Sequence, residues 1–215
     1  MIRTLLIALA LAWAPQLFSQ HGEQRMHQQF SGAEQWSRVF DDPARDAWQK
    51  PDEVVRALEL APGAAVADIG SGTGYFAVRL ARAVPRGRVY GADIEPDMVR
   101  FLNERAARES LANLHAVLAT ERGPNLPAPV DLALLVDTYH HIGQRGEYFA
   151  GLKQMLAPGG RVAIIDFRPD SPVGPPKQHR IAPEKVAEEM AQAGYRLAGE
   201  HAFLPHQYFL IFVPR

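Results

Sequence analysis

Short apolar runs alternate with amphipathic segments along most of this 215-residue chain, and this alternation limits the possible folds more than any other feature. The apolar runs, which predict strands, occupy 64–70, 87–94, 113–119, 130–137 and 161–167. The segments with apolar residues at helical spacing occupy 51–61, 75–84, 96–110, 146–156 and 183–193. Strands that alternate with helices pair in parallel and are buried on both faces, which explains why these runs are continuously apolar.

The C-terminal part of the chain breaks this alternation. Two β-rich runs, 195–203 and 207–213, follow one another without a helix between them. A link this short joins antiparallel strands, because a parallel pair needs a long crossover connection. The expected fold class is therefore α/β, with a doubly wound, seven-stranded, mostly parallel sheet that ends in an antiparallel C-terminal hairpin.

The first twenty residues, "MIRTLLIALALAWAPQLFSQ", have the layout of a secretory signal. Arg3 precedes an apolar stretch over 5–14, and Pro15 and Ser19 follow it before a polar run. We expect a signal peptide over 1–19, a mature chain that begins near Gln20, and a periplasmic or otherwise exported protein. The alternative is an uncleaved membrane anchor, although the apolar run is shorter than the ~20 residues that span a bilayer. This segment is the only one for which we expect a transient membrane association.

The rest of the chain divides into three parts. Residues 20–34 are polar and rich in glutamine, which predicts a linker. Residues 35–60 are expected to be a helical segment, whose Trp36, Phe40 and Trp48 either cover a ligand or pack on the sheet. Residues 61–215 form the main domain.

Composition excludes several function classes. The formal net charge is −1, and no run of Lys and Arg is longer than two, so nucleic acid is not an expected partner. The sequence contains no cysteine, which excludes disulfides, thiolate nucleophiles and zinc–thiolate sites. Nothing in the sequence indicates an oligomeric state.

A glycine-rich turn, "VADIGSGTGYF", follows the first predicted strand and leads directly into a helix. Such a turn brings backbone N–H groups close to a ligand at the carboxyl edge of the sheet. The dinucleotide fingerprint G-x-G-x-x-G has a glycine where this chain has Tyr75, and Asp68 would repel a pyrophosphate. A cationic nucleoside such as S-adenosylmethionine suits the turn better. The expected cofactor contacts here are Asp68, Gly70, Ser71, Gly72, Gly74 and Tyr75.

Asp93 ends the second predicted strand, roughly 20 residues after the glycines, where an acidic residue accepts hydrogen bonds from ribose hydroxyls. Its alternative role is to cap the helix that Pro96 begins. Ile94 would then cover one face of the adenine.

Four motifs together resemble the class I S-adenosylmethionine-dependent methyltransferases: "VADIGSGTGYF", "VYGADIEPDM", "VDLALLVDTYHHI" and "LKQMLAPGGRVAIIDF". The resemblance covers about 53–215 and is nearest to bacterial methyltransferase-domain proteins with small or unassigned acceptors, a group that includes quinone and arsenite enzymes. It implies S-adenosylmethionine as cofactor and a small-molecule methyl acceptor. The cysteines that arsenite enzymes use are missing, so that substrate is excluded. Where the family often has an acidic residue near the adenine amine, Thr120 is the closest match.

The segment "DTYHHI" at the end of the fourth predicted strand contains the first candidates for acting on an acceptor. Asp137, His140 and His141 would lie beside the reacting methyl group, and Asp137 is also an expected cofactor contact. His179 in the proline-rich loop after strand five is a further candidate general base. Either adjacent histidine could instead be structural. Adjacent histidines are poorly spaced for one metal ion and no H-E-x-x-H motif occurs, so no metal site is expected.

Two other functions remain open from the sequence alone. An exported protein could keep the nucleoside-binding crevice without catalysis, because S-adenosylmethionine is made in the cytoplasm. An NAD-type oxidoreductase is the other alternative, against which the glycine spacing argues.

Overall fold

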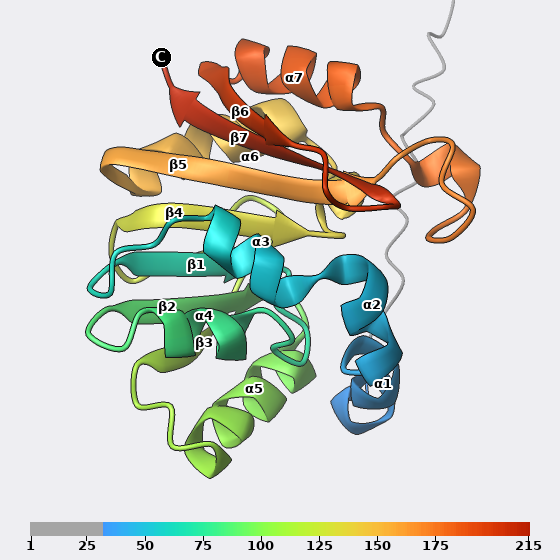
Figure 1. Cartoon of the computed structure of the whole chain (residues 1–215). Coiled ribbons are helices and arrows are strands. Elements are labelled where there is room, and N and C mark those ends of the chain that lie inside the picture. Colours follow the sequence, from blue (N-terminus) through green and yellow to red (C-terminus); the bar gives the residue numbers. More distant parts are fainter. Residues whose placement is uncertain (1–31) are drawn as a thin grey trace, which may run out of the picture.

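The computed structural model describes residues 32–215, which fold around one seven-stranded sheet (Figure 1). The strand order is β3-β2-β1-β4-β5-β7-β6. The strands are β1 Ala65–Ile69, β2 Arg88–Asp93, β3 Leu114–Leu118, β4 Val130–Val136, β5 Leu156–Phe167, β6 Tyr195–His201 and β7 Gln207–Pro214. The first five strands pair in parallel, and β7 pairs antiparallel with both β5 and β6. The predicted fold class and the C-terminal hairpin are therefore confirmed.

Helices cover both faces of this sheet (Figure 1). One face carries α3 Pro51–Ala57, α4 Ala77–Ala83 and α5 Pro96–Arg108, and the other carries α6 Arg145–Leu152 and α7 Pro183–Gln192. Leu80 and Leu102 belong to the apolar cluster on the first face, and Phe149 and Met190 belong to the cluster on the second. The strands are continuously apolar because both of their faces are buried.

The connection into β5 differs from the expectation. The helix predicted over 146–156 ends at Leu152, and a short 3₁₀ turn, η3 Lys153–Met155, follows it. Strand β5 already begins at Leu156, which pairs with Val130, and the register shifts before Arg161 joins the ladder. The Pro-Gly-Gly segment is therefore an irregular part of the strand, with a positive φ of 80° at Gly159, and it does not close the helix.

Before the sheet, α1 Ala33–Phe40, the 3₁₀ turn η1 Pro43–Arg45 and α2 Asp46–Gln49 lie at the edge where β1 and β4 end (Figure 1). The Asp97 carboxylate on α5 accepts the backbone N–H groups of Gly32, at 2.9 Å, and Ala33, at 2.7 Å. These bonds satisfy donors in the first turn of α1, which would otherwise lack partners. Helix α1 therefore includes Ala33 and Glu34, which the sequence analysis assigned to the linker.

The predicted signal peptide over 1–19 and most of the predicted linker lie outside the described residues. Within 32–215, no helix is both long enough and apolar enough to cross a membrane.

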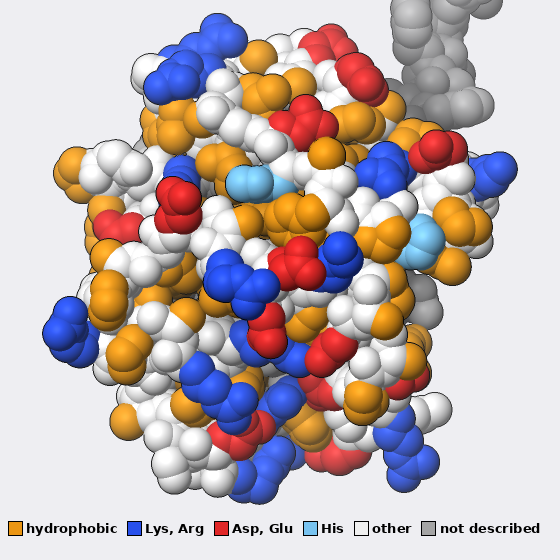
Figure 2. Space-filling view, in the orientation of Figure 1, with side chains coloured by type: hydrophobic (Ala, Val, Ile, Leu, Met, Phe, Trp, Pro, Cys, Tyr) orange, Lys and Arg blue, Asp and Glu red, His pale blue; other side chains and the backbone are white. Residues whose placement is uncertain are grey.

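The face that carries α4 and α5 has cationic and anionic side chains interspersed across it (Figure 2). Several of them form ion pairs between elements. Arg82 on α4 lies 2.7 Å from Glu109, and Arg79 on α4 lies 3.2 Å from Asp46 on α2. The second pair connects α4 to the segment that precedes the sheet.

Candidate active site

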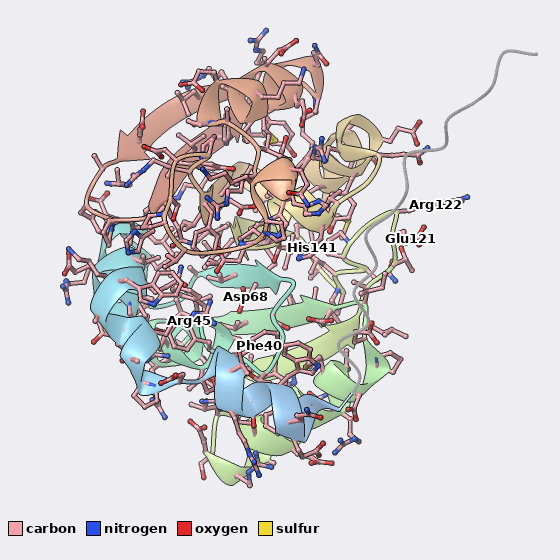
Figure 3. The ribbon with its side chains drawn as sticks, turned by 90° about the vertical axis from the view of Figure 1, so that its right-hand side faces the viewer. Phe40, Arg45, Asp68, Glu121, Arg122 and His141 are labelled. Carbon is pink, nitrogen blue, oxygen red and sulfur yellow. The ribbon has the colours of Figure 1, made fainter. Side chains whose placement is uncertain are left out.

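Three carboxylates lie at the carboxyl ends of three neighbouring strands. Asp68 is near the end of β1, Asp93 ends β2, and Asp137 directly follows β4. Because these strands are parallel neighbours in the sheet, their ends meet at one edge, and Asp68 lies at the centre of that edge in Figure 3. This is the edge at which open α/β sheets bind their ligands.

The glycine turn between β1 and α4 is shaped mainly by packing within the protein. A side chain at Gly70, where φ is +73°, would collide with Thr138, and a side chain at Gly74, where φ is +96°, would collide with Leu102. A Cβ atom at Gly72 would come within 3.3 Å of the Phe40 ring on α1. Of the three glycines, Gly72 is therefore the one that faces the segment covering the site.

Asp93 holds this turn to the end of β2. Its Oδ2 accepts the backbone N–H of Gly72 at 2.7 Å, and its Oδ1 accepts that of Glu95 at 3.0 Å. The N-cap residue of α5 is Glu95, so the alternative role of Asp93 as the helix cap is wrong. Burial raises the pKa of Asp93 above its usual range, although these hydrogen bonds oppose the effect. The side chain of Ile94, beside it, is 38% exposed and offers an apolar surface.

Asp68 and Ser71 are both buried polar residues at this turn. Burial raises the pKa of Asp68 to about 7. The neighbouring negative charge of Asp93 adds to this rise, and a hydrogen bond from the Ala77 N–H opposes it. The Ser71 hydroxyl lies against Gly91 of β2 and has no hydrogen-bond partner among residues 32–215. Its side chain therefore points toward the sheet.

Tyr75 brings the preceding segment to the turn. Its hydroxyl donates to the Asp46 carboxylate, and its ring lies between the guanidinium groups of Arg45 and Arg79, each 4.2 Å from the ring centroid. Tyr75 was predicted to contact the cofactor, and the structure places it against the two arginines. Figure 3 shows Arg45 and Phe40 on the same side of Asp68.

A buried polar ring joins α2 to the floor of the site. Arg45 Nε donates to Gln49 Oε1 at 2.9 Å, and Gln49 Nε2 donates to Gln207 Oε1 at 2.6 Å. Gln207 in turn donates to Asp137, and Arg45 Nη2 lies 3.4 Å from the other oxygen of Asp137. Arg45, Gln49 and Gln207 could not be predicted from the sequence, because no local pattern joins residues so distant along the chain.

The two adjacent histidines of the 3₁₀ turn η2 Tyr139–His141 have different surroundings. His140 is buried, and its Nδ1 lies 2.8 Å from Oδ2 of Asp166 in β5. Burial alone would lower the pKa of His140, but the hydrogen bond and charge of Asp166, together with the charge of Asp137, outweigh it and raise the pKa. The side chain of His141 is exposed, and its ring centroid lies 4.1 Å from that of His140.

Asp166 was also missed in the sequence analysis, although a signal for it was present. It is a carboxylate near the carboxyl end of an apolar strand, like Asp68 and Asp93. Besides His140 Nδ1, it accepts the backbone N–H of His140 at 3.2 Å and that of Phe167 at 2.8 Å. Asp166 thus fixes the position of η2 relative to the sheet.

The remaining predicted site residues lie on separate loops. His179 belongs to the 3₁₀ turn η4 Lys177–His179 and is half-buried. Thr120 is exposed, and its backbone N–H donates to Gly123 O at 2.9 Å within a tight loop after β3. Glu121 and Arg122 of that loop point outward (Figure 3). The structure does not join Thr120 or His179 to the buried polar groups described above.

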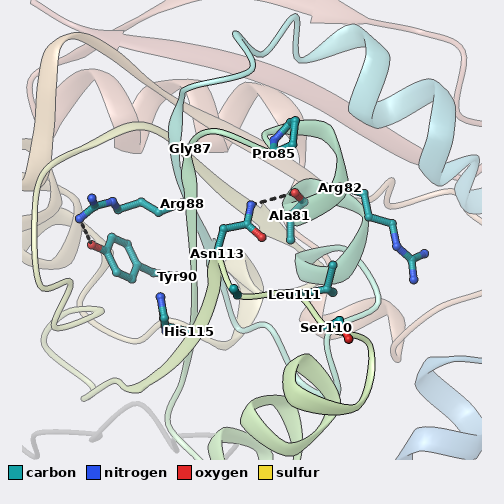
Figure 4. A pocket seen from close by; sticks show the side chains of 11 residues that line it. Ala81, Arg82, Pro85, Gly87, Arg88, Tyr90, Ser110, Leu111, Asn113 and His115 are labelled. Carbon is teal, nitrogen blue, oxygen red and sulfur yellow. Dashed lines mark hydrogen bonds between the residues drawn. The ribbon is translucent and has the colours of Figure 1, made fainter.

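A pocket of about 630 Å³ lies away from this edge (Figure 4). Arg88 and Tyr90 of β2 line it together with Asn113 before β3, and none of its lining residues belongs to the glycine turn or to η2. Within residues 32–215, no group of three or more His, Asp or Glu side chains is arranged to hold a metal ion.

Comparison with known proteins supports the interpretation of this edge. Residues 66–160 match the family model of a methyltransferase domain. An uncharacterised methyltransferase of Mycobacterium tuberculosis is 33% identical over 102 residues, which are 47% of this chain and 50% of that protein. The chain thus spans about half the length of this curated relative.

Solved structures show the same fold. A SAM-dependent methyltransferase from Aquifex aeolicus superimposes with a TM-score of 0.77 at 24% identity, over 84% of this chain and 97% of that one. Magnesium protoporphyrin IX methyltransferase from Synechocystis PCC 6803, solved with bound SAM, gives a TM-score of 0.65 at 21% identity, over 89% and 95% of the two chains. With the family match, the strand order and the glycine turn, they support a class I S-adenosylmethionine-dependent methyltransferase.

Proposed function

We propose that this protein transfers the methyl group of S-adenosylmethionine to a small-molecule acceptor. The observation that carries the proposal is the set of carboxylates around the glycine turn: Asp68, Asp93 and Asp137. They suit a ligand with a sulfonium and an ammonium group, and they would repel the pyrophosphate of a dinucleotide. The match to the methyltransferase family model supports the same cofactor.

The residues around the turn also leave hydrogen-bonding capacity for this cofactor. A Cβ atom at Gly72 would lie 3.3 Å from the Phe40 ring, so a larger residue at this position of the turn would be crowded against α1. One oxygen of Asp93 already binds Gly72 N–H, and a carboxylate oxygen can accept more than one hydrogen bond, which leaves capacity for the ribose hydroxyls. Ile94 would cover the adenine. Bound S-adenosylmethionine would supply an electrophilic methyl carbon, so the protein's main task is to position the acceptor.

The η2 turn would act on the acceptor. The exposed ring of His141 is the group that would take an acceptor proton, while buried His140 packs against it and is itself held by Asp166. An acceptor that must lose a proton during the transfer, such as a hydroxyl group, needs such a base. Asp137 and His179 are the further candidates for this role.

Transfer of an isotope-labelled methyl group tests the proposal. The purified protein is incubated with labelled S-adenosylmethionine and the small-molecule extract of its own cell envelope, and mass spectrometry then locates the label. A labelled small molecule, together with S-adenosylhomocysteine, is the expected result. Cofactor binding without any labelled product would favour the non-catalytic alternative. Binding of NAD in place of S-adenosylmethionine would refute the proposal.

A further inference from the structure

Arg45 brings a positive charge from the segment before the sheet into an edge that is rich in carboxylates. Its side chain is only 16% exposed. Burial raises the pKa values of both Asp68 and Asp137 to about 7, and the guanidinium charge of Arg45 opposes this rise at both carboxylates. Arg45 belongs to η1, which is far from both strands in the sequence and reaches the site only through the fold.

The three polar contacts of Arg45 are unequal. Its Nη1 donates to Phe40 O at 2.8 Å, and its Nε donates to Gln49 Oε1 at 2.9 Å. The contact between Nη2 and Asp137 Oδ2 is longer, at 3.4 Å. The first two bonds hold the guanidinium in place, so Nη2 can exchange its partner without displacing the side chain.

Asp137 is also held independently of Arg45. Gln207 donates to its Oδ1, and the Asp137 backbone N–H donates to Ile165 O at 2.9 Å. Asp137 would therefore stay in position if Arg45 turned to another partner. Its Oδ2 would then be able to accept a hydrogen bond from a cationic ligand group.

The next step rests on the proposed function. The amino-acid end of S-adenosylmethionine carries an ammonium group and a carboxylate. Asp68 and Asp137 match the ammonium, but they would repel the carboxylate, which needs a cation nearby. The Arg45 guanidinium supplies this cation, because it stays charged at neutral pH and its Nη2 can donate a charge-assisted hydrogen bond to a carboxylate oxygen.

We propose that Arg45 recognises the α-carboxylate of the cofactor. When the cofactor binds, Arg45 gives up its long contact with Asp137 and pairs with this carboxylate. This exchange leaves Asp137 for the ammonium group. Arg45 is then a specificity-determining residue, which favours ligands with the complete amino-acid end over simpler adenosine derivatives. Because Arg45 also holds Phe40 and Gln49, the same contact would stabilise the α1–α2 segment over the bound cofactor.

Removing the carboxylate from the ligand and the guanidinium from the protein tests this proposal. Calorimetry compares S-adenosylhomocysteine with S-adenosyl-3-thiopropylamine, which keeps the ammonium group and lacks the carboxylate. The unmodified protein should prefer the first ligand by about 10- to 100-fold, the range expected for hydrogen bonds between charged groups. Arg45→Gln should lose most of this preference, and Arg45→Lys should keep part of it.

Arg79→Gln is the matched control. Arg79 lies over the same Tyr75 ring at the same 4.2 Å distance as Arg45, but its charged contacts are with Asp46 and Asp52. Its loss should leave the preference between the two ligands unchanged. An equal loss of preference in Arg79→Gln would mean that the effect arises from the stacked arrangement, which would overturn the proposal.

The other outcomes separate this proposal from the proposed function. If the unmodified protein binds neither ligand, the proposed cofactor is wrong. If it binds both equally well, or if a folded Arg45→Gln variant keeps the full preference, the role of Arg45 is refuted and the proposed function stands. If Arg45→Gln does not fold, Arg45→Lys decides: a severalfold drop in preference supports the proposal, and an unchanged preference overturns it.

Discussion

The Asp93 carboxylate accepts the backbone N–H of Gly72 at 2.7 Å and thereby joins the end of β2 to the glycine turn after β1. Asp93 is thus placed both to shape the turn and to bind a ribose. These two roles can be separated by substitution, because asparagine keeps one acceptor oxygen and alanine keeps none.

Asp93→Ala should weaken S-adenosylmethionine binding by about 1.5 to 3 kcal/mol, the range for hydrogen bonds to a charged group. The fold should survive, because the apolar clusters on the two faces of the sheet do not include this side chain. Asp93→Asn should bind with intermediate affinity. Calorimetry measures the affinity and circular dichroism checks folding; unchanged affinity in a folded Asp93→Ala variant would leave the residue only its role in the turn.

His141→Ala should lower the rate of methyl transfer by roughly 10²-fold or more, while cofactor affinity changes little, because only a general base is lost. Its melting temperature should stay close to that of the unmodified protein, since the side chain is exposed. His179→Ala serves as the comparison from the neighbouring loop. A normal rate in His141→Ala with a slow His179→Ala variant would move the base to η4.

His140→Ala should act mainly on stability. It would leave the buried Asp166 carboxylate without its imidazole partner, and losing one member of a buried charged pair is strongly destabilising, by about 3–5 kcal/mol. Thermal denaturation measures this effect. If His140→Ala melts normally and only its rate falls, then His140 acts directly on the acceptor.

Asp68→Asn should stabilise the cofactor-free protein, and more so at high pH. The pKa of Asp68 is raised from 3.8 to about 7, so between these pH values the folded state keeps a proton that the unfolded state has lost. Stability therefore falls as pH rises through this window. The gain from the substitution should be near zero at pH 4 and on the order of 1–3 kcal/mol at pH 8. Denaturant unfolding at both pH values measures it; an equal gain at both would contradict the assigned cause.

Much of the fold could be predicted because its signals are local. Residues that are adjacent in the sequence are enough to predict the continuous apolar strands, the turn after β1 and the terminal hairpin. The same holds for Asp68, Asp93 and the pair of histidines, since each lies close to the end of an apolar run. The boundary at Leu152 was missed because the pairing of Leu156 with Val130, a distant residue, overrides the local helical pattern.

The detailed site could not be predicted for the same reason. Arg45 and Asp137 are 92 residues apart, and nothing near either of them indicates the other. Gly70 and Gly74 stay predicted cofactor contacts, and the structure adds a packing reason for glycine at both positions, because Thr138 and Leu102 leave no room for a side chain. Ser71 also stays a predicted cofactor contact, and in the structure its side chain turns toward β2.

Export of the protein stays a prediction from the first twenty residues. The basic residue Arg3 and the apolar stretch after it should direct the chain across the membrane, with cleavage near Gln20. N-terminal sequencing of protein from fractionated cells checks this. A soluble cytoplasmic chain that still begins with Met1 would contradict it, and it would also remove the question of how the cofactor reaches an exported enzyme.

Calorimetric titration of the purified protein with S-adenosylhomocysteine and, separately, with NAD tests the central claim most directly. The three carboxylates at the ends of β1, β2 and β4 should favour the phosphate-free ligand, so S-adenosylhomocysteine should bind and NAD should give no measurable heat of binding. Binding of NAD to a protein that does not bind S-adenosylhomocysteine would contradict the account.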